Sequence, residues 1–200
     1  GGGSFFSGIL AVAKKVQGAL PIVGLMSRLA NPEGGGFDEL AYPEFCRAMI
    51  NNAPLSFRIA QGELEKVYGK PANSRWVLLI LFFTKTGVGI VPTKEIISSA
   101  RRLRVTQDIE IEVERFEQSK ATVLKKYEMV ARPEGKLVDR LAVTVDALCM
   151  LCIGLKEGEP VPDVAAPFLQ DIIVATFPEA DPALIAFAIS SKAERGAAYV

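Results

Sequence analysis

Hydrophobic positions between Leu137 and Leu155 recur at steps of three and four residues, in two adjacent rows. The first row is Leu137, Leu141, Val145, Leu148, Cys152 and Leu155, and the second is Val138, Ala142, Cys149 and Ile153. Two adjacent rows give a helix a wide apolar face. A face of this width must be covered from more than one side. We therefore expect an all-α, irregular helical bundle built around a central apolar helix at about 137–155.

Similar periodicity predicts further helices along the chain. They are expected at 43–50, 55–68, 93–103, 109–130, 163–173 and 182–193. Asn73 or Ser74, Asp163 and Asp181 are the residue types that cap helix N-termini. The run WVLLILFF at 76–83 fits a buried strand or a buried helix, because a fully apolar run has no period to read. Together these elements form one helical domain at 37–200.

The first 36 residues differ from the rest and are expected to form an N-terminal apolar arm. Between Phe5 and Leu29 the only charged residues are Lys14, Lys15 and Arg28, and glycines and Pro21 interrupt any long helix. Two short helical pieces lying along a surface fit this pattern, followed by a hinge at 31–36. The arm either packs on its own domain or anchors the chain to a membrane surface or a larger partner.

Composition excludes several classes of function. The 200 residues contain no histidine, which removes the commonest general base and metal ligand, and with it triad hydrolases. Lys plus Arg and Asp plus Glu both number 23, so no net charge favours nucleic acid. Half of the residues are hydrophobic at zero net charge, which indicates that some apolar surface meets a partner.

Cys149 and Cys152 form a C-x-x-C pair late in the central helix. A redox pair needs a thiolate stabilised at a helix N-terminus, which this position does not provide. A zinc or iron–sulfur site needs about four ligands, and Cys46 is the only further cysteine in the sequence. Core packing is the favoured interpretation. Gly87-Val-Gly89 lacks the third glycine of a dinucleotide loop, so a turn is expected.

Charged residues offer few alternatives. Glu110, Glu112, Glu114 and Glu117 are spaced so that they do not converge, and a solvated helix face is expected. Asp146 interrupts the apolar helix and is expected at a boundary or paired with Lys or Arg. Arg101, Arg102 and Arg104 form a compact basic patch at a helix C-terminus.

The apolar, lightly basic lead SFFSGILAVAKKVQGALPIVGLMSRLANPEGG and the helical body after it resemble an accessory, non-catalytic subunit of an algal plastid photosystem or antenna supercomplex. The resemblance implies a plastid, thylakoid-associated location and a role in complex assembly or antenna docking. It carries over no functional residue. No resident cofactor is expected, although peripheral chlorophyll or carotenoid contact needs no histidine and stays open.

We therefore expect a non-enzymatic interaction protein that docks on a large multi-subunit complex, at a membrane surface and without nucleic acid. The alternative is a soluble helical ligand carrier or a small enzyme that works without histidine. The residues expected to contact the partner or membrane are Phe5, Phe6, Ile9, Leu10, Lys14, Lys15, Leu20, Ile22, Leu25, Arg101, Arg102 and Arg104.

Overall fold

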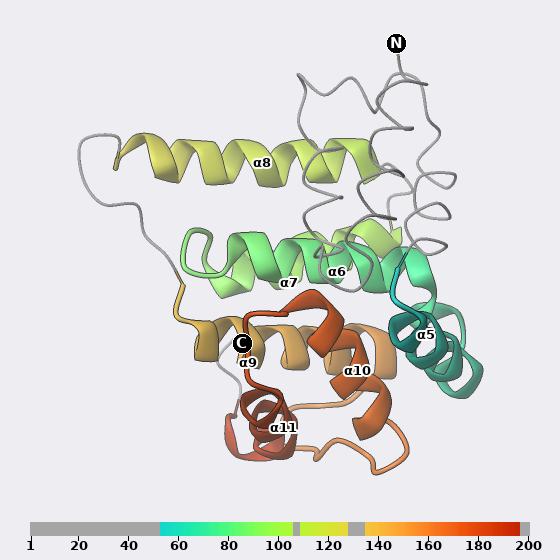
Figure 1. Ribbon diagram of the computed structural model, residues 1–200. Helices are drawn as coiled ribbons and strands as arrows, with labels where there is room; N and C mark the ends of the chain where they lie inside the picture. The colour runs from blue at the N-terminus through green and yellow to red at the C-terminus, as the bar shows by residue number, and fades with distance from the viewer. Residues whose placement is uncertain (1–52, 106–108, 128–134, 197–200) are drawn as a thin grey trace.

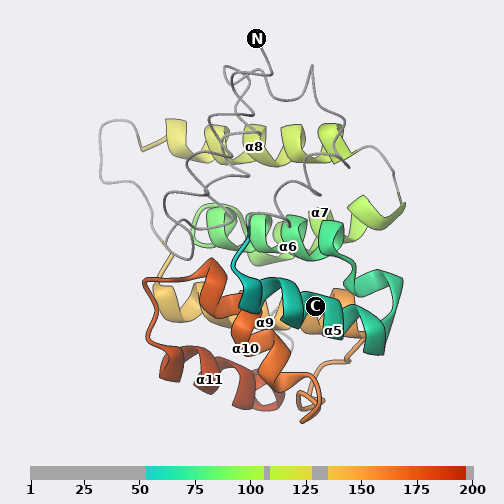
Figure 2. The same cartoon turned by 45° about the vertical axis from the view of Figure 1, so that its right-hand side comes forward.

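A computed structural model describes residues 53–105, 109–127 and 135–196, and within these ranges the fold is all-α, as the sequence predicts (Figures 1 and 2). The α-helices are α5 (Leu55–Tyr68), α6 (Ser74–Gly87), α7 (Thr93–Val105), α8 (Ile109–Lys125), α9 (Leu137–Leu148), α10 (Ala166–Thr176) and α11 (Pro182–Ser190). Short helical turns join them: η2 (Lys70–Ala72), η3 (Cys149–Ile153) and η4 (Lys192–Glu194).

The ambiguous run at 76–83 is helical and lies within α6. The Asn73 side chain caps this helix by accepting a hydrogen bond from the backbone N–H of Trp76 at 2.9 Å. Every residue from Val77 to Thr84 is buried. A helix covered on all sides needs no polar face, which is why its sequence shows no helical period.

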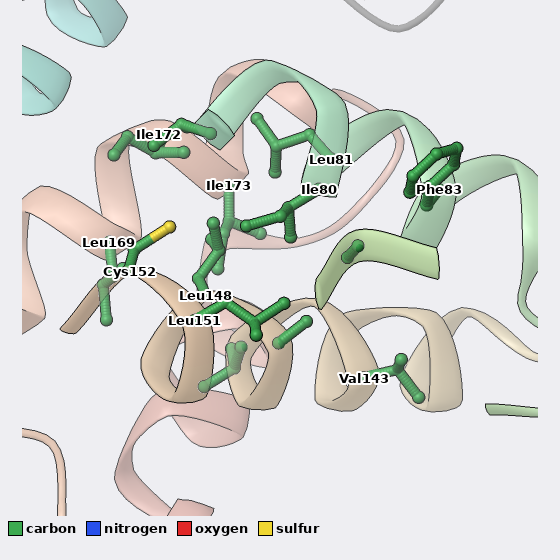
Figure 3. Close-up of a cluster of buried hydrophobic side chains, with 14 of the residues drawn as sticks. Ile80, Leu81, Phe83, Val143, Leu148, Leu151, Cys152, Leu169, Ile172 and Ile173 are labelled. Atoms are coloured by element: carbon green, nitrogen blue, oxygen red, sulfur yellow. The ribbon is translucent and has the colours of Figure 1, made fainter. Parts of the chain in front are cut away.

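The central helix predicted at 137–155 is confirmed as α9 followed directly by η3, a π-helical turn. Gly154 ends it in the left-handed region at φ 75°, and the Cys149 carbonyl accepts hydrogen bonds from Gly154 and Leu155. α9 lies between α6 on one side and α11 on the other (Figure 1). Side chains of α6, α9, η3 and α10 meet in the core (Figure 3).

α8 forms an outer layer beyond α6 and α7 (Figure 1). It is joined to them through an aromatic cluster in which the Phe116 ring lies 4.4 Å from Phe83 and 6.0 Å from Phe82, centroid to centroid. Lys120 falls in the apolar seam of α8, and its ammonium lies over the rings of Phe82 and Phe116. Aromatic contacts thus hold the outer layer in place.

The prediction that Asp163 caps a helix is wrong. α10 begins at Ala166, after a turn in which the Pro162 carbonyl accepts hydrogen bonds from Ala165 and Ala166 at 2.9 and 3.0 Å. Pro167 stands in the first turn of α10, where its missing N–H costs nothing. Asp181, by contrast, caps α11 as predicted, with its carboxylate accepting from Ala183 at 2.9 Å.

Residues 1–52 lie outside the described ranges, and so do the predicted arm, its hinge and the helix at 43–50. Those expectations stay predictions. Among the described helices, none is both long and apolar enough to cross a lipid bilayer.

Candidate interaction surfaces

The side chains of Cys149 and Cys152 are both buried in η3. Burial raises the pKa of Cys149 to about 12, because it disfavours the charged thiolate more strongly than the nearby Lys192 favours it. At neutral pH the Cys149 sulfur is therefore protonated and a poor nucleophile. No group of three or more metal-ligating side chains occurs within the described ranges. The two cysteines act as core residues, as the sequence favours.

Glu112 corrects the expectation of a solvated glutamate face. It is buried between α7 and α8, where it pairs with Arg102 Nε at 3.0 Å and Arg115 Nη1 at 3.3 Å. Glu112 lies four residues before buried Phe116, so the two side chains share the inward side of α8. Glu114 is exposed as expected.

The basic patch of three arginines is only partly available at the surface. Arg102 is committed to Glu112 and also donates to Ser99 Oγ at 3.1 Å. Arg101 is exposed, and its Nη2 lies 3.3 Å from the Met150 sulfur. The side chain of Arg104 lies outside the described part of the chain. The geometry thus leaves Arg101 as the described member of this patch that is free to meet a partner.

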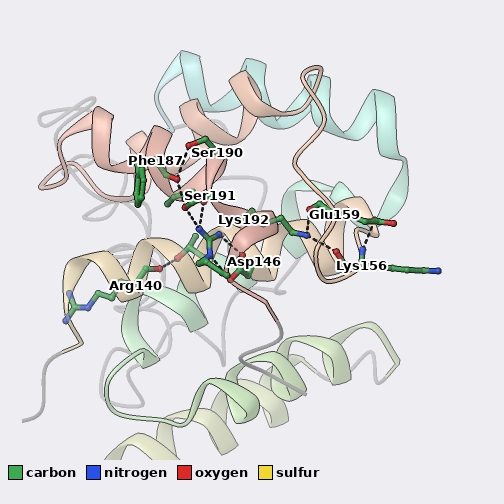
Figure 4. Close-up of polar contacts among 11 residues, drawn as sticks. Arg140, Asp146, Lys156, Glu159, Phe187, Ser190, Ser191 and Lys192 are labelled. Atoms are coloured by element: carbon green, nitrogen blue, oxygen red, sulfur yellow. Dashed lines mark hydrogen bonds and ion pairs between the residues drawn. The ribbon is translucent and has the colours of Figure 1, made fainter.

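Asp146 is paired with an arginine, as predicted. Arg195 donates a hydrogen bond to each carboxylate oxygen of Asp146, from Nη2 at 2.6 Å and from Nε at 3.1 Å (Figure 4). The same guanidinium donates to the Ala188 carbonyl and to Ser191 Oγ. Arg195 therefore fastens η4 and the end of α11 to α9.

Two lysines also join separate segments, and the sequence did not single them out. Buried Lys192 donates to the carbonyls of Lys156 and Glu159 at 2.8 and 2.7 Å (Figure 4). Lys85 donates to the Thr176 carbonyl, and its ammonium lies 4.8 Å from the centre of the Phe177 ring. Burial lowers the pKa of Lys85, while neighbouring Glu179 opposes that shift.

Exposed apolar side chains gather on two helices at different places on the bundle. On α5 they are Leu55, Ile59 and Val67, 60%, 55% and 49% exposed. On α11 they are Leu184 and Phe187, 40% and 66% exposed. The sequence of α11, PALIAFAIS, contains no charged residue, which indicates that this helix has no strongly polar side to face water. Such exposed side chains can bind a partner, and the buried ionic groups described above are occupied within the fold.

Comparison with known proteins shows which family the chain is related to. It is 31% identical over 188 residues to the maize (Zea mays) protein named "Photosystem I assembly factor PSA3, chloroplastic", covering 92% of this chain and 69% of that protein. The chain belongs to the PSA3 family. The Arabidopsis thaliana protein of the same name is 27% identical over 188 residues, covering 92% of this chain and 66% of that protein. No family model matches the chain. No solved structure matches it either.

Membership of the PSA3 family bears out the coarser part of the resemblance, an accessory photosystem protein of the plastid. Both relatives are named as assembly factors rather than as subunits of the finished complex or its antenna. Both come from land plants, whereas the resemblance pointed to algae.

Proposed function

We propose that this protein is a non-enzymatic photosystem I assembly factor of the plastid. The observation that carries the proposal is the 31% identity to the maize assembly factor over 92% of this chain. Similarity over nearly the whole chain relates the entire helical body to the named protein, rather than one motif. An assembly factor works by binding, so its surface matters more than a buried reactive group.

The geometry of the described residues supports a binding role. Four ionisable side chains with restricted solvent access hold elements together: Lys85, Glu112, Asp146 and Lys192. Groups engaged in this way give the bundle a fixed shape. A fixed helical body with exposed apolar residues on α5 and α11 suits a protein that holds another chain in position.

In the finer proposal, the protein docks at the thylakoid surface on a large assembly intermediate. The apolar residues of 5–29 and the cations Lys14 and Lys15 would supply contact with the membrane or the partner. Arg101 would add an exposed cation from the helical body. The apolar and basic character of this segment supports the proposal.

Complementation tests the function. The chain, fused to the chloroplast targeting sequence of the Arabidopsis relative, is expressed in plants in which that relative has been inactivated. Restored photosystem I accumulation, measured by immunoblot of its subunits and by light-induced absorbance of its primary donor, is the expected result. Photosystem I that stays at the level of the inactivated plants would refute the proposal, provided that the protein accumulates.

Deletion of 5–29 tests the role of the arm. After mild detergent extraction, the full chain should migrate on a native gel with a large complex, and the deletion variant should migrate as a small species. Deletion of 1–4, which removes Gly-Gly-Gly-Ser, is the matched control and should leave migration unchanged. Undiminished association without 5–29 would exclude the arm as the anchor.

A further inference from the structure

The outward side of α11 is an apolar surface with an unusual sequence. Ser190 is the only polar residue of this helix. Ile185, Ala188 and Ile189 face the core, while Leu184 and Phe187, three residues apart, lie together on the exposed side. A helix that is apolar all round is normally buried. In the described part of the chain nothing covers this side of α11.

α10 extends this surface. Gln170 Nε2 donates to the Pro182 carbonyl at 3.0 Å, so the first turn of α11 lies against the middle of α10. Figure 2 shows the two helices side by side. Val174, one turn beyond Gln170, is also exposed, and so is Asp171. We call Leu184, Phe187 and Val174, with Asp171 and Asp181 at the margin, the α11 face.

The two helices that form the α11 face carry only negative charge. Residues 166–190, which comprise α10, α11 and the turn between them, contain three carboxylates and no lysine or arginine. These carboxylates, Asp171, Glu179 and Asp181, are all exposed. Glu179 pairs with Lys85 of α6 at 3.4 Å, which leaves the negative charges of Asp171 and Asp181 at the margin of the face.

We propose that the α11 face binds a basic amphipathic segment of a partner protein. Apolar side chains of that segment would cover Leu184 and Phe187, and its lysines or arginines would meet Asp171 and Asp181. An anionic lipid surface would be repelled by the same carboxylates. Two copies of the face would likewise repel each other. The proposal rests on the proposed function for one point, that the partner belongs to photosystem I assembly.

A peptide-binding experiment tests the chemistry of the α11 face. The probe is a short fluorescent amphipathic helix of leucine and lysine, and the control probe replaces every lysine with glutamate. Fluorescence anisotropy with the full chain should show that the lysine probe binds and that its affinity falls as salt is added. The glutamate probe should bind at least about tenfold more weakly than the lysine probe. Equal binding of both probes would overturn the proposal.

Variants locate the binding surface. The double variant Leu184→Ser with Phe187→Ser should weaken binding of the lysine probe about tenfold or more. Asp171→Lys should weaken it and reduce its salt dependence. The matched control is Leu55→Ser with Ile59→Ser, an equally exposed apolar pair on α5, which should bind like the unmodified chain. Circular dichroism verifies that each variant is folded. Equal losses of affinity for the lysine probe in the α5 and α11 variants would contradict the assignment. So would a dimer of the unmodified chain, seen in sedimentation velocity, that is lost when Phe187 is replaced.

Complementation separates this inference from the proposed function. If the unmodified chain fails to restore photosystem I, the proposed function fails, whatever the peptide result. If the unmodified chain restores photosystem I and the α11 double variant restores it equally, the partner assignment of the α11 face fails while the function stands. The expected result is restoration by the unmodified chain and the α5 variant, and a severalfold lower photosystem I level with the α11 variant.

Discussion

The pair formed by Asp146 and Arg195 should be the most sensitive polar contact of the bundle. Its two partners stand 49 residues apart in the sequence, and their side chains are 9% and 20% exposed. Replacing Arg195 with Met removes the pair and leaves a carboxylate inside the bundle. Breaking a buried pair in this way costs about 3–5 kcal/mol. Because Asp146 has other interactions as well, we expect the lower end, about 3 kcal/mol.

Replacing Asp146 with Leu should cost less, about 2 kcal/mol. Arg195 would keep its hydrogen bonds to the Ala188 carbonyl and to Ser191, and its charge has more access to water. The double variant leaves no charge unpaired and fills the space with apolar atoms. It should therefore lose no more than about 2 kcal/mol, which gives a coupling energy of about 3 kcal/mol.

Urea denaturation of the four proteins measures these energies, and thermal unfolding gives a second reading. A loss of 3 kcal/mol corresponds to a melting temperature lower by about 6–12 °C in a chain of this size. Lys66→Met is the control, because Lys66 and Glu63 form an ion pair at the surface and its loss should cost less than about 0.5 kcal/mol. Additive losses in the double variant, about 5 kcal/mol, would show that the pair does not act as a unit.

Three further outcomes are expected. Gly87→Ala should lose about 1–3 kcal/mol in urea denaturation, because a Cβ there would lie 2.6 Å from Phe116 Cζ, whereas Gly62→Ala on α5, with no atom within 4 Å, should gain up to about 1 kcal/mol. The Cys149 thiol keeps its proton to about pH 12 in the folded protein but loses it from about pH 9 in the unfolded chain, so the free energy of unfolding falls as pH rises. Between pH 8 and pH 10 the free energy of unfolding of the unmodified chain should fall by about 1.4 kcal/mol relative to that of Cys149→Val. A difference that stays constant over this range would contradict the raised pKa. Lys192→Met should cost about 1–3 kcal/mol and speed amide hydrogen exchange in 156–159, and unchanged exchange there would show that Lys192 does not hold that loop.

Local signals were enough to predict much of the fold. The two rows of hydrophobic residues in 137–155 predicted the central helix, because spacing along one helix fixes which residues share a face. Asn73 and Asp181 were recognised as caps for the same reason, since a cap bonds within three residues of itself. α6 stayed ambiguous because burial on every side erases the pattern that distinguishes a helix from a strand.

Long-range contacts could not be predicted in the same way. The sequence indicated that Asp146 lies at a boundary or is paired with a cation, but Arg195 is brought to it only by the packing of α11 on α9. Glu112 looked solvated because its partner Arg102 belongs to the preceding helix. The α11 face was missed because its residues read as core positions, and only the packing shows which of them are left outside.

The π-helical turn at Cys149–Ile153 has a consequence for how this family can change in length. A π-helical hydrogen bond spans one more residue than an α-helical one, so the turn accommodates one extra residue within the helix. Deleting one residue of this turn, such as the half-buried Met150, would convert it into an ordinary α-helical turn. The segments before and after the turn would keep their positions. The same deletion in the middle of α9 would rotate every later side chain by about 100° and turn its apolar rows away from α6. Relatives that differ by one residue in this helix should therefore differ at this turn.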